Sequence, residues 1–171
     1  LKRLADRVQH EGGQVLEGLA MEKLLTRLGA TLAARDAAPS APLDAFGRDK
    51  SQEKALIDAL TPIYRRWFRV TTEGIDGIPA TGGAILVANH GGVLPWDMAM
   101  LKTAVALEHP AHRTVRPLIE DGLMHAAFLG TFLSRAGAVR ANPENAETVL
   151  REGELVSAFP EGNRGIQKPY K

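Results

Sequence analysis

Apolar residues recur at helical spacing in the first part of the chain. From Leu1 to Arg35 they return every three or four residues, with a break at a pair of glycines, so we expect two amphipathic helices. A linker rich in alanine, proline and aspartate follows, from Asp36 to Lys50. The helical period then returns from Ser51 to Phe68 and predicts a further amphipathic helix, with Ser51 as its N-cap.

The hydrophobic period changes after this helix, and short stretches of strand character alternate with helical patterns. The expected strands are Arg69–Glu73, Ala84–Ala88, Thr114–Ile119, Ala138–Arg140 and Glu154–Phe159, and the expected helices are Asp97–Glu108, Gly122–Ala136 and Pro143–Arg151. This alternation predicts an α/β fold, a layered αβα domain with a largely parallel sheet. We place this domain at residues 51–171, after an N-terminal helical segment and linker at residues 1–50.

The composition supports a globular domain and excludes several kinds of site. The 171 residues are 44% hydrophobic, enough for a core, and the absence of cysteine excludes disulfide scaffolds, thiolate nucleophiles and thiolate metal sites. Lysine and arginine total 21 against 20 acidic residues, a balance that argues against a nucleic-acid partner. The uncharged stretch between Asp76 and Asp97 contains several glycines and prolines, so it does not predict a membrane span.

The end of the helix predicted at Ser51–Phe68 combines aromatic and basic residues. The sequence there is Tyr64-Arg65-Arg66-Trp67-Phe68-Arg69. Aromatic rings at the level of lipid headgroups, with arginines against anionic lipid, are typical of an interfacial membrane anchor. The pattern also fits a core helix with a solvated arginine edge, and the sequence leaves both interpretations open.

A histidine follows the apolar strand Ala84–Ala88. The chain continues as Asn89-His90-Gly91-Gly92-Val93-Leu94-Pro95-Trp96-Asp97 into the next predicted helix. His90 is thereby placed at the carboxyl end of a strand, where parallel sheets bind ligands, and an imidazole oriented by Asp97 can act as a general base there. Gly91 and Gly92 let the backbone approach a substrate and offer N–H groups to a developing oxyanion. The alternative is a polar turn in which Asp97 only caps the helix.

A second polar block follows the strand predicted at Glu154–Phe159. It reads Phe159-Pro160-Glu161-Gly162-Asn163-Arg164, and a glycine turn beside an arginine can present backbone amides and a guanidinium to a phosphate. Arg140 ends another predicted strand, and Lys168 lies shortly after the block. Converging cations in a chain of net charge +1 indicate an anionic ligand at this edge of the sheet.

Together, the two blocks resemble signatures of the lysophospholipid and glycerol-phosphate acyltransferase family. Asn89-His90 followed by an aspartate looks like the first signature, and Phe159-Pro160-Glu161-Gly162 followed by Arg164 looks like a later one; Arg140 matches the arginine block between them. The resemblance covers about Arg69 to the C-terminus. It implies that His90, oriented by Asp97, deprotonates an acceptor hydroxyl for direct attack on the thioester of acyl-CoA or acyl-carrier protein, without a covalent acyl-enzyme.

The same resemblance implies an acceptor site and a cellular setting. In this family the acceptor site is shaped by the matching residues, here Glu161, Gly162 and Arg164, while Arg140 contacts the acceptor's phosphate. We expect no metal and no cofactor beyond the thioester co-substrate, and a peripheral position on the cytoplasmic face of a membrane, as in phospholipid biosynthesis. The family continues with further strands and helices, so we expect the domain to extend past Lys171.

The loop between His90 and Asp97 separates this chain from the common family pattern. Six residues lie between the pair, more than is usual, and His90-Gly91-Gly92 with Pro95-Trp96-Asp97 is similar to acylglycerol-type relatives. The sequence therefore leaves three classes of acceptor open: a lysophospholipid, glycerol phosphate, and an acylglycerol without phosphate. Glu120 and Asp121 also stay open as alternative partners of the imidazole.

Other classes of protein fit the sequence less well. No serine has the Gly-x-Ser-x-Gly setting of a hydrolase, and the segment from Gly162 to Lys168 lacks the spacing of a phosphate-binding loop. The other histidines form no helical pair with an acid between them, which argues against a metal site. A catalytically silent lipid-binding or membrane-scaffold protein remains the alternative, although binding alone does not require His90 with its acid.

Overall fold

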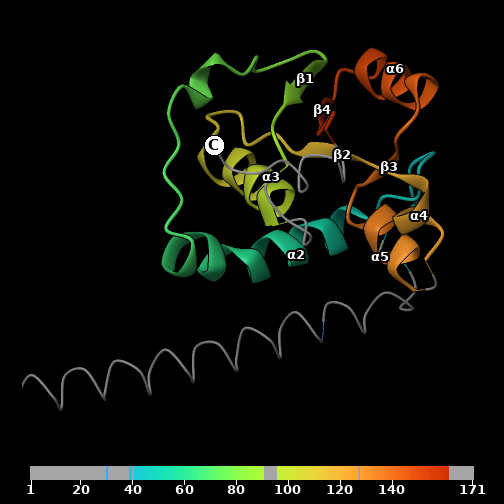
Figure 1. Ribbon diagram of the computed structural model, residues 1–171, viewed down its shortest axis with the longest axis horizontal. Coiled ribbons are helices and arrows are strands. Elements are labelled where there is room, and N and C mark those ends of the chain that lie inside the picture. Colours follow the sequence, from blue (N-terminus) through green and yellow to red (C-terminus); the bar gives the residue numbers. More distant parts are fainter. Residues whose placement is uncertain (1–29, 31–38, 40, 91–95, 127, 162–171) are drawn as a thin grey trace, which may run out of the picture.

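The fold is a parallel sheet with helices on both of its faces (Figure 1). The computed structural model describes residues 41–90, 96–126 and 128–161, with Ala30 and Pro39; the helices predicted between Leu1 and Arg35 otherwise fall outside this part. Within the described residues, four strands form one sheet in the order β1-β4-β2-β3. The strands are β1 (Ala84–Val87), β2 (Val115–Ile119), β3 (Val139–Arg140) and β4 (Leu155–Ala158). The predicted α/β fold with a parallel sheet is confirmed.

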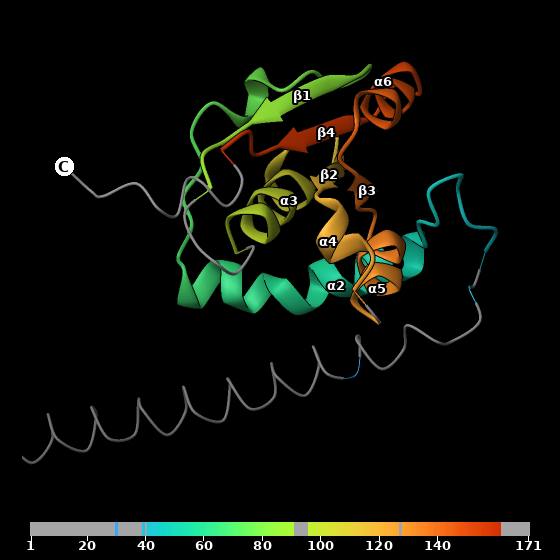
Figure 2. The same ribbon diagram turned by 45° about the vertical axis from the view of Figure 1, so that its right-hand side comes forward.

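Helices cover both faces because the chain reverses its direction across the sheet. It steps one way from β1 to β2 and β3, and back again from β3 to β4. Right-handed crossovers in opposite directions place their helices on opposite faces. Accordingly, α3 (Trp96–Glu108) lies on one face and α6 (Pro143–Arg151) on the other (Figure 2). α2 (Lys50–Pro62) packs on α3, and α4 (Asp121–Met124) and α5 (Leu129–Arg135) connect β2 to β3.

The central strand β4 contributes to the core on both faces of the sheet. Leu155 packs with Val105 of α3 and Val115 of β2, whereas Val156 packs with Val149 of α6. All of these side chains are buried. Because successive side chains of a strand point to opposite faces, two neighbouring residues of β4 connect the two helical layers through the sheet.

The N-terminal end of α2 lies earlier than the sequence predicts. The carboxylate of Asp49 accepts the N–H groups of Ser51 at 2.9 Å and Gln52 at 3.3 Å, so Asp49 is the N-cap. The hydrogen bond from the Ser51 hydroxyl is the largest cause of a lowered pKa of Asp49. The prediction of Ser51 as N-cap is wrong, because the longer reach of the aspartate two residues earlier already satisfies the free N–H groups.

The other end of α2 is a π-helical turn rather than a continuous α-helix. α2 ends at Pro62, and η2 (Ile63–Trp67) follows, in which the Phe68 N–H donates to the Ile63 carbonyl at 2.9 Å. Pro62 has no N–H, and its ring crowds the carbonyl one turn earlier, which favours a wider turn at this point. The aromatic end of the predicted helix is therefore rotated relative to a regular helix.

Residues 69–73, predicted as a strand, form a loop, so that prediction is wrong. Arg69 has a φ of 47°, outside the β region, and the Val70 N–H donates to the Tyr64 carbonyl at 3.1 Å. The backbone thus completes the π-helical turn instead of pairing with a strand. A short 3-10 turn, η3 (Ile75–Gly77), then leads towards β1.

The single helix predicted at Gly122–Ala136 is divided into α4 and α5. Phe128 precedes α5 with a φ of 68°, which an α-helix does not allow. The two short helices approach closely at Gly130, where a Cβ atom would lie 1.9 Å from the Met124 carbonyl oxygen. The apolar period continues through the break, so it gives no sign of the division.

The carboxylate of Glu108 ties η2 and the loop after it to the end of α3. It accepts hydrogen bonds from the hydroxyls of Thr72 and Tyr64, the latter at 2.6 Å, and these two bonds, Thr72 first, lower the pKa of Glu108. A carboxyl group whose pKa is lower in the folded state contributes stability above its unfolded pKa, about 4.3 for glutamate. That contribution is lost as the pH falls through the folded-state pKa.

Glu108→Gln is expected to lower the free energy of unfolding at neutral pH by about 1 kcal/mol or less, because the Glu108 side chain that loses its charge is exposed to solvent. The difference from the wild type should shrink as the pH falls below about 4.3, where the wild-type carboxylate also becomes protonated. Urea unfolding followed by tryptophan fluorescence over this pH range measures both proteins. A difference that stays constant down to the lowest pH would contradict this role of Glu108.

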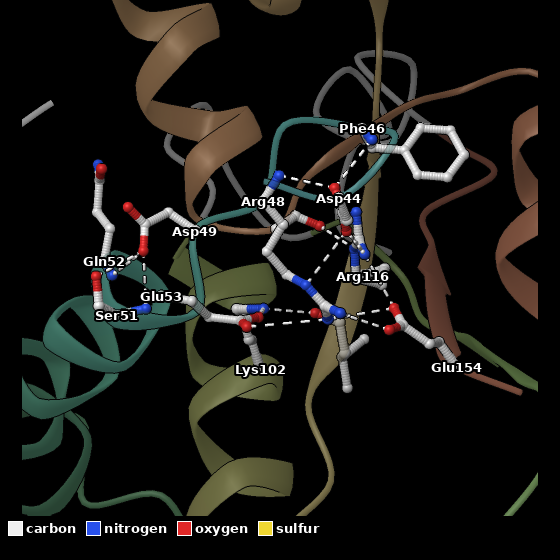
Figure 3. A network of polar contacts seen from close by, with 12 residues as sticks. Asp44, Phe46, Arg48, Asp49, Ser51, Gln52, Glu53, Lys102, Arg116 and Glu154 are labelled. Carbon is white, nitrogen blue, oxygen red and sulfur yellow. Dashed lines mark hydrogen bonds and ion pairs between the residues drawn. The ribbon is translucent and has the colours of Figure 1, made fainter. Parts of the chain in front are cut away.

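The described end of the predicted linker is attached to the sheet by ion pairs (Figure 3). Arg48 donates to Glu154, just before β4, at 2.6 Å, and Asp44 accepts from Arg116 of β2 at 2.6 Å. Residues 44–49 therefore pack against the α/β domain at the amino-terminal ends of its strands.

Candidate active site

The carboxyl ends of β1 and β4 lie side by side. Val87 of β1 is opposite Ala158 of β4, and the Ala88 N–H donates to the Ala158 carbonyl at 3.2 Å. Parallel neighbours end at the same edge of a sheet, so the segments that begin at Asn89 and Phe159 leave the sheet together. The two polar blocks of the sequence thus start from adjacent positions.

The imidazole of His90 contacts the carboxylate of Asp97, in the first turn of α3. His90 Nδ1 and Asp97 Oδ2 are 2.6 Å apart, and the other oxygen, Oδ1, accepts the Met98 N–H at 2.8 Å. A proton on Nδ1, assigned from this pairing, makes Nε2 the proton-accepting nitrogen. The side chains of His90 and Asp97 are 14% and 25% exposed, so the pair is shielded but still accessible. The contact expected from the sequence is present.

The second block contacts the first through an aromatic ring. The ring of Phe159, the first residue after β4, lies with its centroid 5.6 Å from that of His90, at an interplanar angle of 58°. Tilted contacts of this kind between aromatic rings are favourable, so Phe159 adds a second restraint on the position of the imidazole. Two side chains therefore contact the imidazole of His90, the Asp97 carboxylate and the Phe159 ring.

The remaining predicted site residues are only partly within the described part of the chain. Glu161 lies in the turn after β4 and is partly buried. The residues that fall outside the described ranges are Gly91, Gly92, Gly162, Arg164 and Lys168. The oxyanion and acceptor contacts that the sequence suggests for them stay predictions.

Arg140 lies at the end of β3, at the same edge of the sheet as His90. β4 and β2 lie between β1 and β3, and neighbouring strands are about 4.8 Å apart, so β3 runs roughly 14 Å from β1. Both carboxylate oxygens of Asp121, which follows β2, accept from the Arg140 guanidinium. Asp121, open in the sequence as a partner of the imidazole, pairs with Arg140, and Asp97 pairs with His90.

Sequence reasoning gives neither the Phe159 contact nor the Asp121 pair. Both contacts join residues that follow different strands, and they depend on the strand order in the sheet. One feature of the sequence could have indicated them, because Phe159 and Asp121 each follow an apolar strand directly or within two residues.

An exposed aromatic surface adjoins the His90–Asp97 pair. Trp96 immediately precedes Asp97, and its ring centroid lies 5.7 Å from that of Phe68, which follows η2. Trp67 is 63% exposed, Phe68 41% and Trp96 37%. We call these three side chains the aromatic surface.

The structure divides the basic and aromatic segment between the core and the surface. Tyr64 is buried and packs in a cluster with Met100 of α3, so it belongs to the core and not to an exposed anchor. The arginines beside the aromatic surface are exposed: Arg65, Arg66 and Arg69.

A groove of about 490 Å³ lies at the opposite edge of the sheet. It is lined by side chains that include Arg48, Glu53, Thr114 and Glu154, near the amino-terminal ends of β2 and β4. None of the predicted site residues lines it, so its chemistry is separate from that of His90.

Comparison with known proteins gives a consistent picture of the family. A family model described as acyltransferase matches residues 69–168. Uncharacterized proteins of Mycobacterium leprae and Mycobacterium tuberculosis are 42% and 40% identical to the chain over 130 residues, which cover 75% of this chain. The same alignments cover 35% and 36% of those proteins, so the chain spans about a third of the length of the curated relatives it matches.

No solved structure gives a significant match to the chain. Among the described helices, none has both the length and the apolar character needed to span a bilayer.

Proposed function

This chain belongs to the acyltransferase family, and we propose that it transfers a fatty acyl group from a thioester to the hydroxyl of a lipid acceptor, with His90 as general base. The observation that carries the proposal is the contact of 2.6 Å between His90 Nδ1 and Asp97 Oδ2 at the carboxyl edge of a parallel sheet. A catalytically silent lipid-binding protein would not need an imidazole oriented in this way, next to the second signature block.

The proposed reaction follows from the proton positions. With Nδ1 donating to Asp97, Nε2 accepts the proton of the acceptor hydroxyl as its oxygen attacks the thioester carbonyl. The new C–O bond forms a tetrahedral intermediate, which collapses as the C–S bond breaks. The imidazolium then returns its proton to the departing thiolate, so the products are an ester and a free thiol and no acyl-enzyme forms. Asp97 stabilises the imidazolium between the two steps.

We assign the remaining substrate contacts from the sequence. Gly91 and Gly92 would supply N–H groups to the oxyanion, and the acceptor would meet Arg140 and the block Glu161–Arg164. The donor is acyl-CoA or acyl-carrier protein. The acceptor is a lysophospholipid, glycerol phosphate or an acylglycerol.

The direct test is an acyl-transfer assay on the purified protein. Labelled acyl-CoA and acyl-carrier protein are each combined with lysophospholipids, glycerol 3-phosphate and monoacylglycerol, and labelled ester is separated by chromatography. We expect ester formation with at least one pair, together with stoichiometric release of thiol. A folded protein that forms no ester with any pair would contradict the proposal.

We further propose that the protein binds peripherally to the cytoplasmic face of a membrane through the aromatic surface. Trp67, Phe68 and Trp96 are exposed next to the His90–Asp97 pair, and exposed arginines flank them. Aromatic rings favour the headgroup region, and each arginine near an anionic surface adds about 1 kcal/mol of attraction. A lipid acceptor would then reach His90 directly from the bilayer.

The double variant Trp67→Ser with Phe68→Ser is expected to lower partitioning onto vesicles that contain anionic phospholipid by about tenfold or more, because two large apolar contacts are lost. Cosedimentation with vesicles measures the partition coefficient. Leu43→Ser is the matched control, since Leu43 is 40% exposed but lies outside the aromatic surface. Equal partitioning of the double variant and the control would overturn this membrane contact.

A further inference from the structure

The hydrogen bond to Asp97 does not by itself fix the direction of the proton-accepting nitrogen of His90. It joins His90 Nδ1 to Asp97 Oδ2 at 2.6 Å, and Nε2 lies on the far side of the imidazole. Hydrogen bonds tolerate deviations from linearity of about 30° with little loss. A general base, in contrast, must stay within about 2.6–3.2 Å of the oxygen whose proton it takes. A second contact that limits the tilt of the ring is therefore needed.

The ring of Phe159 supplies a second contact, and it comes from a different strand. Its centroid lies 5.6 Å from that of the imidazole, with 58° between the two planes, within the range of favourable tilted ring pairs. Phe159 directly follows β4, whereas Asp97 lies in the first turn of α3. A tilt of the imidazole away from its position would weaken the contact with one of these two partners.

The two rings are attached to strand ends that are hydrogen-bonded to each other. The Ala88 N–H donates to the Ala158 carbonyl at 3.2 Å, two residues before His90 and one residue before Phe159. β1 and β4 lie side by side up to this point (Figure 2). Side chains placed by strands are held more precisely than those on long loops, so the Phe159 ring can restrict the movement of its neighbour.

Burial in the core does not account for Phe159. Its side chain is only partly buried, and it belongs to none of the hydrophobic clusters that the described residues form. The core residues of β4 are instead Leu155 and Val156, which are fully buried. Phe159 is an aromatic residue at the rim of the sheet, and its ring contact is with the candidate base.

We propose that Phe159 is a positioning residue that keeps Nε2 of His90 in the orientation required of a general base. This inference rests on the proposed function, because the orientation of the imidazole matters only if His90 accepts the proton. Phe159 acts through His90 and not through a contact with either substrate. The two polar blocks of the sequence are then joined at the base itself.

The first test compares the steady-state kinetics of Phe159→Leu, which keeps an apolar side chain but removes the ring, with those of the wild type. We expect kcat to fall about two- to tenfold, the loss of one aromatic pair, with KM for donor and acceptor unchanged. Phe159→Tyr keeps a ring and should retain most of kcat. Phe128→Leu is the matched control, because Phe128 is 69% exposed and lies between α4 and α5.

A double-mutant cycle separates an effect through His90 from a general effect on the fold. In a His90→Ala background there is no imidazole to orient, so Phe159→Leu should lower the residual rate no further. An equal fractional loss in both backgrounds would overturn the inference. So would a wild-type kcat in Phe159→Leu, or a rise in KM without a change in kcat.

Proton NMR tests the inference without any acyl transfer. The Nδ1 proton of His90 should give a low-field resonance that is lost in Asp97→Asn, which assigns it. Phe159→Leu should broaden this resonance, because a more mobile ring exchanges the proton with water faster, while Phe159→Tyr should keep it. If these changes are seen and no acceptor is acylated, only the proposed function fails.

Cross-relaxation between the ring protons of Phe159 and His90 needs only the wild type, so it decides the matter even if Phe159→Leu does not fold. We expect it to be observed, since the two ring centroids are 5.6 Å apart. Its absence would overturn the inference, as would a sharp Nδ1 resonance of full intensity in Phe159→Leu. Acyl transfer with either of these results would leave the proposed function standing.

Discussion

His90→Ala is expected to lower the rate of acyl transfer by about two to four orders of magnitude. A positioned general base contributes about this much to a reaction in which a hydroxyl is deprotonated during attack. The imidazole has what the role requires: its Nδ1 is 2.6 Å from the Asp97 carboxylate, and the ring is partly accessible at the edge of the sheet. Initial rates over a range of acceptor concentrations give kcat/KM for both proteins.

The control for this variant is another histidine. His112 is exposed and lies before β2, at the opposite edge of the sheet, so His112→Ala should keep the wild-type rate. Asp97→Asn should also lower the rate strongly, because an amide can donate to Nδ1 and favour the wrong tautomer. If His90→Ala turns over acceptor as fast as the His112 control, the imidazole is not the base.

The sequence predicts most of the sheet because its strands are short apolar runs between clear helix signals. Ala84–Val87 and Leu155–Ala158 lie within the predicted strands. α6 occupies the predicted range Pro143–Arg151, since Asn142 caps it by accepting the Asn145 N–H at 2.7 Å and Pro143 fits the first turn. These are local signals, and local signals can be read from a sequence.

The wrong predictions come from short-range contacts that the hydrophobic period does not encode. Nothing in the residues 69–73 shows that the Tyr64 carbonyl captures the Val70 N–H, which prevents strand pairing. The division of Gly122–Ala136 into two helices depends on the close approach of Gly130 to Met124, and the apolar period is the same on both sides of the break. In each case a contact between residues six positions apart overrides the structure that the hydrophobic period predicts.

The candidate site shows a second limit, which concerns contacts between residues distant in the sequence. His90 and Asp97 are seven positions apart and flank one loop, so their contact can be expected from the sequence. The contact of Phe159 with His90 requires β4 to lie beside β1, although six other helices and strands separate them along the chain. Strand order is set by how the helices α3 and α6 pack on the two faces, and no single segment encodes it.

The amino-terminal edge of the sheet holds a network of charges that links five parts of the fold: residues 44–49, α2, α3, β2 and the turn before β4 (Figure 3). Arg116 of β2 is fully buried; its Nε donates to the Gly137 carbonyl at 2.7 Å, and its Nη1 lies 2.6 Å from Asp44 and 3.0 Å from Glu154. Glu154 also accepts from Arg48.

The other members of this network are Glu53 of α2 and Lys102 of α3, which pair with each other. The network contains three acidic and three basic side chains, so its net charge is zero. Removal of one charge therefore leaves an opposite charge without full compensation.

Arg116→Met is expected to lower the free energy of unfolding by about 3–5 kcal/mol. Methionine fills much of the same volume, so the main loss is the cation, and removal of one partner from a buried ion pair leaves the carboxylates of Asp44 and Glu154 undercompensated. Urea unfolding followed by circular dichroism measures the change. The same substitution at Arg151, whose pair with Glu147 is exposed, should change stability by less than about 1 kcal/mol.

The second half of this experiment separates charge from packing. If the uncompensated carboxylates cause the loss, the double variant Arg116→Met with Asp44→Asn should recover part of the stability, because one of the two stranded charges is removed. Asp44→Asn can also be made alone, in the wild type. If it lowers the free energy of unfolding by the same amount there and in Arg116→Met, the two residues act independently. Equal stability of Arg116→Met and Arg151→Met would mean that the network does not hold residues 44–49 on the sheet.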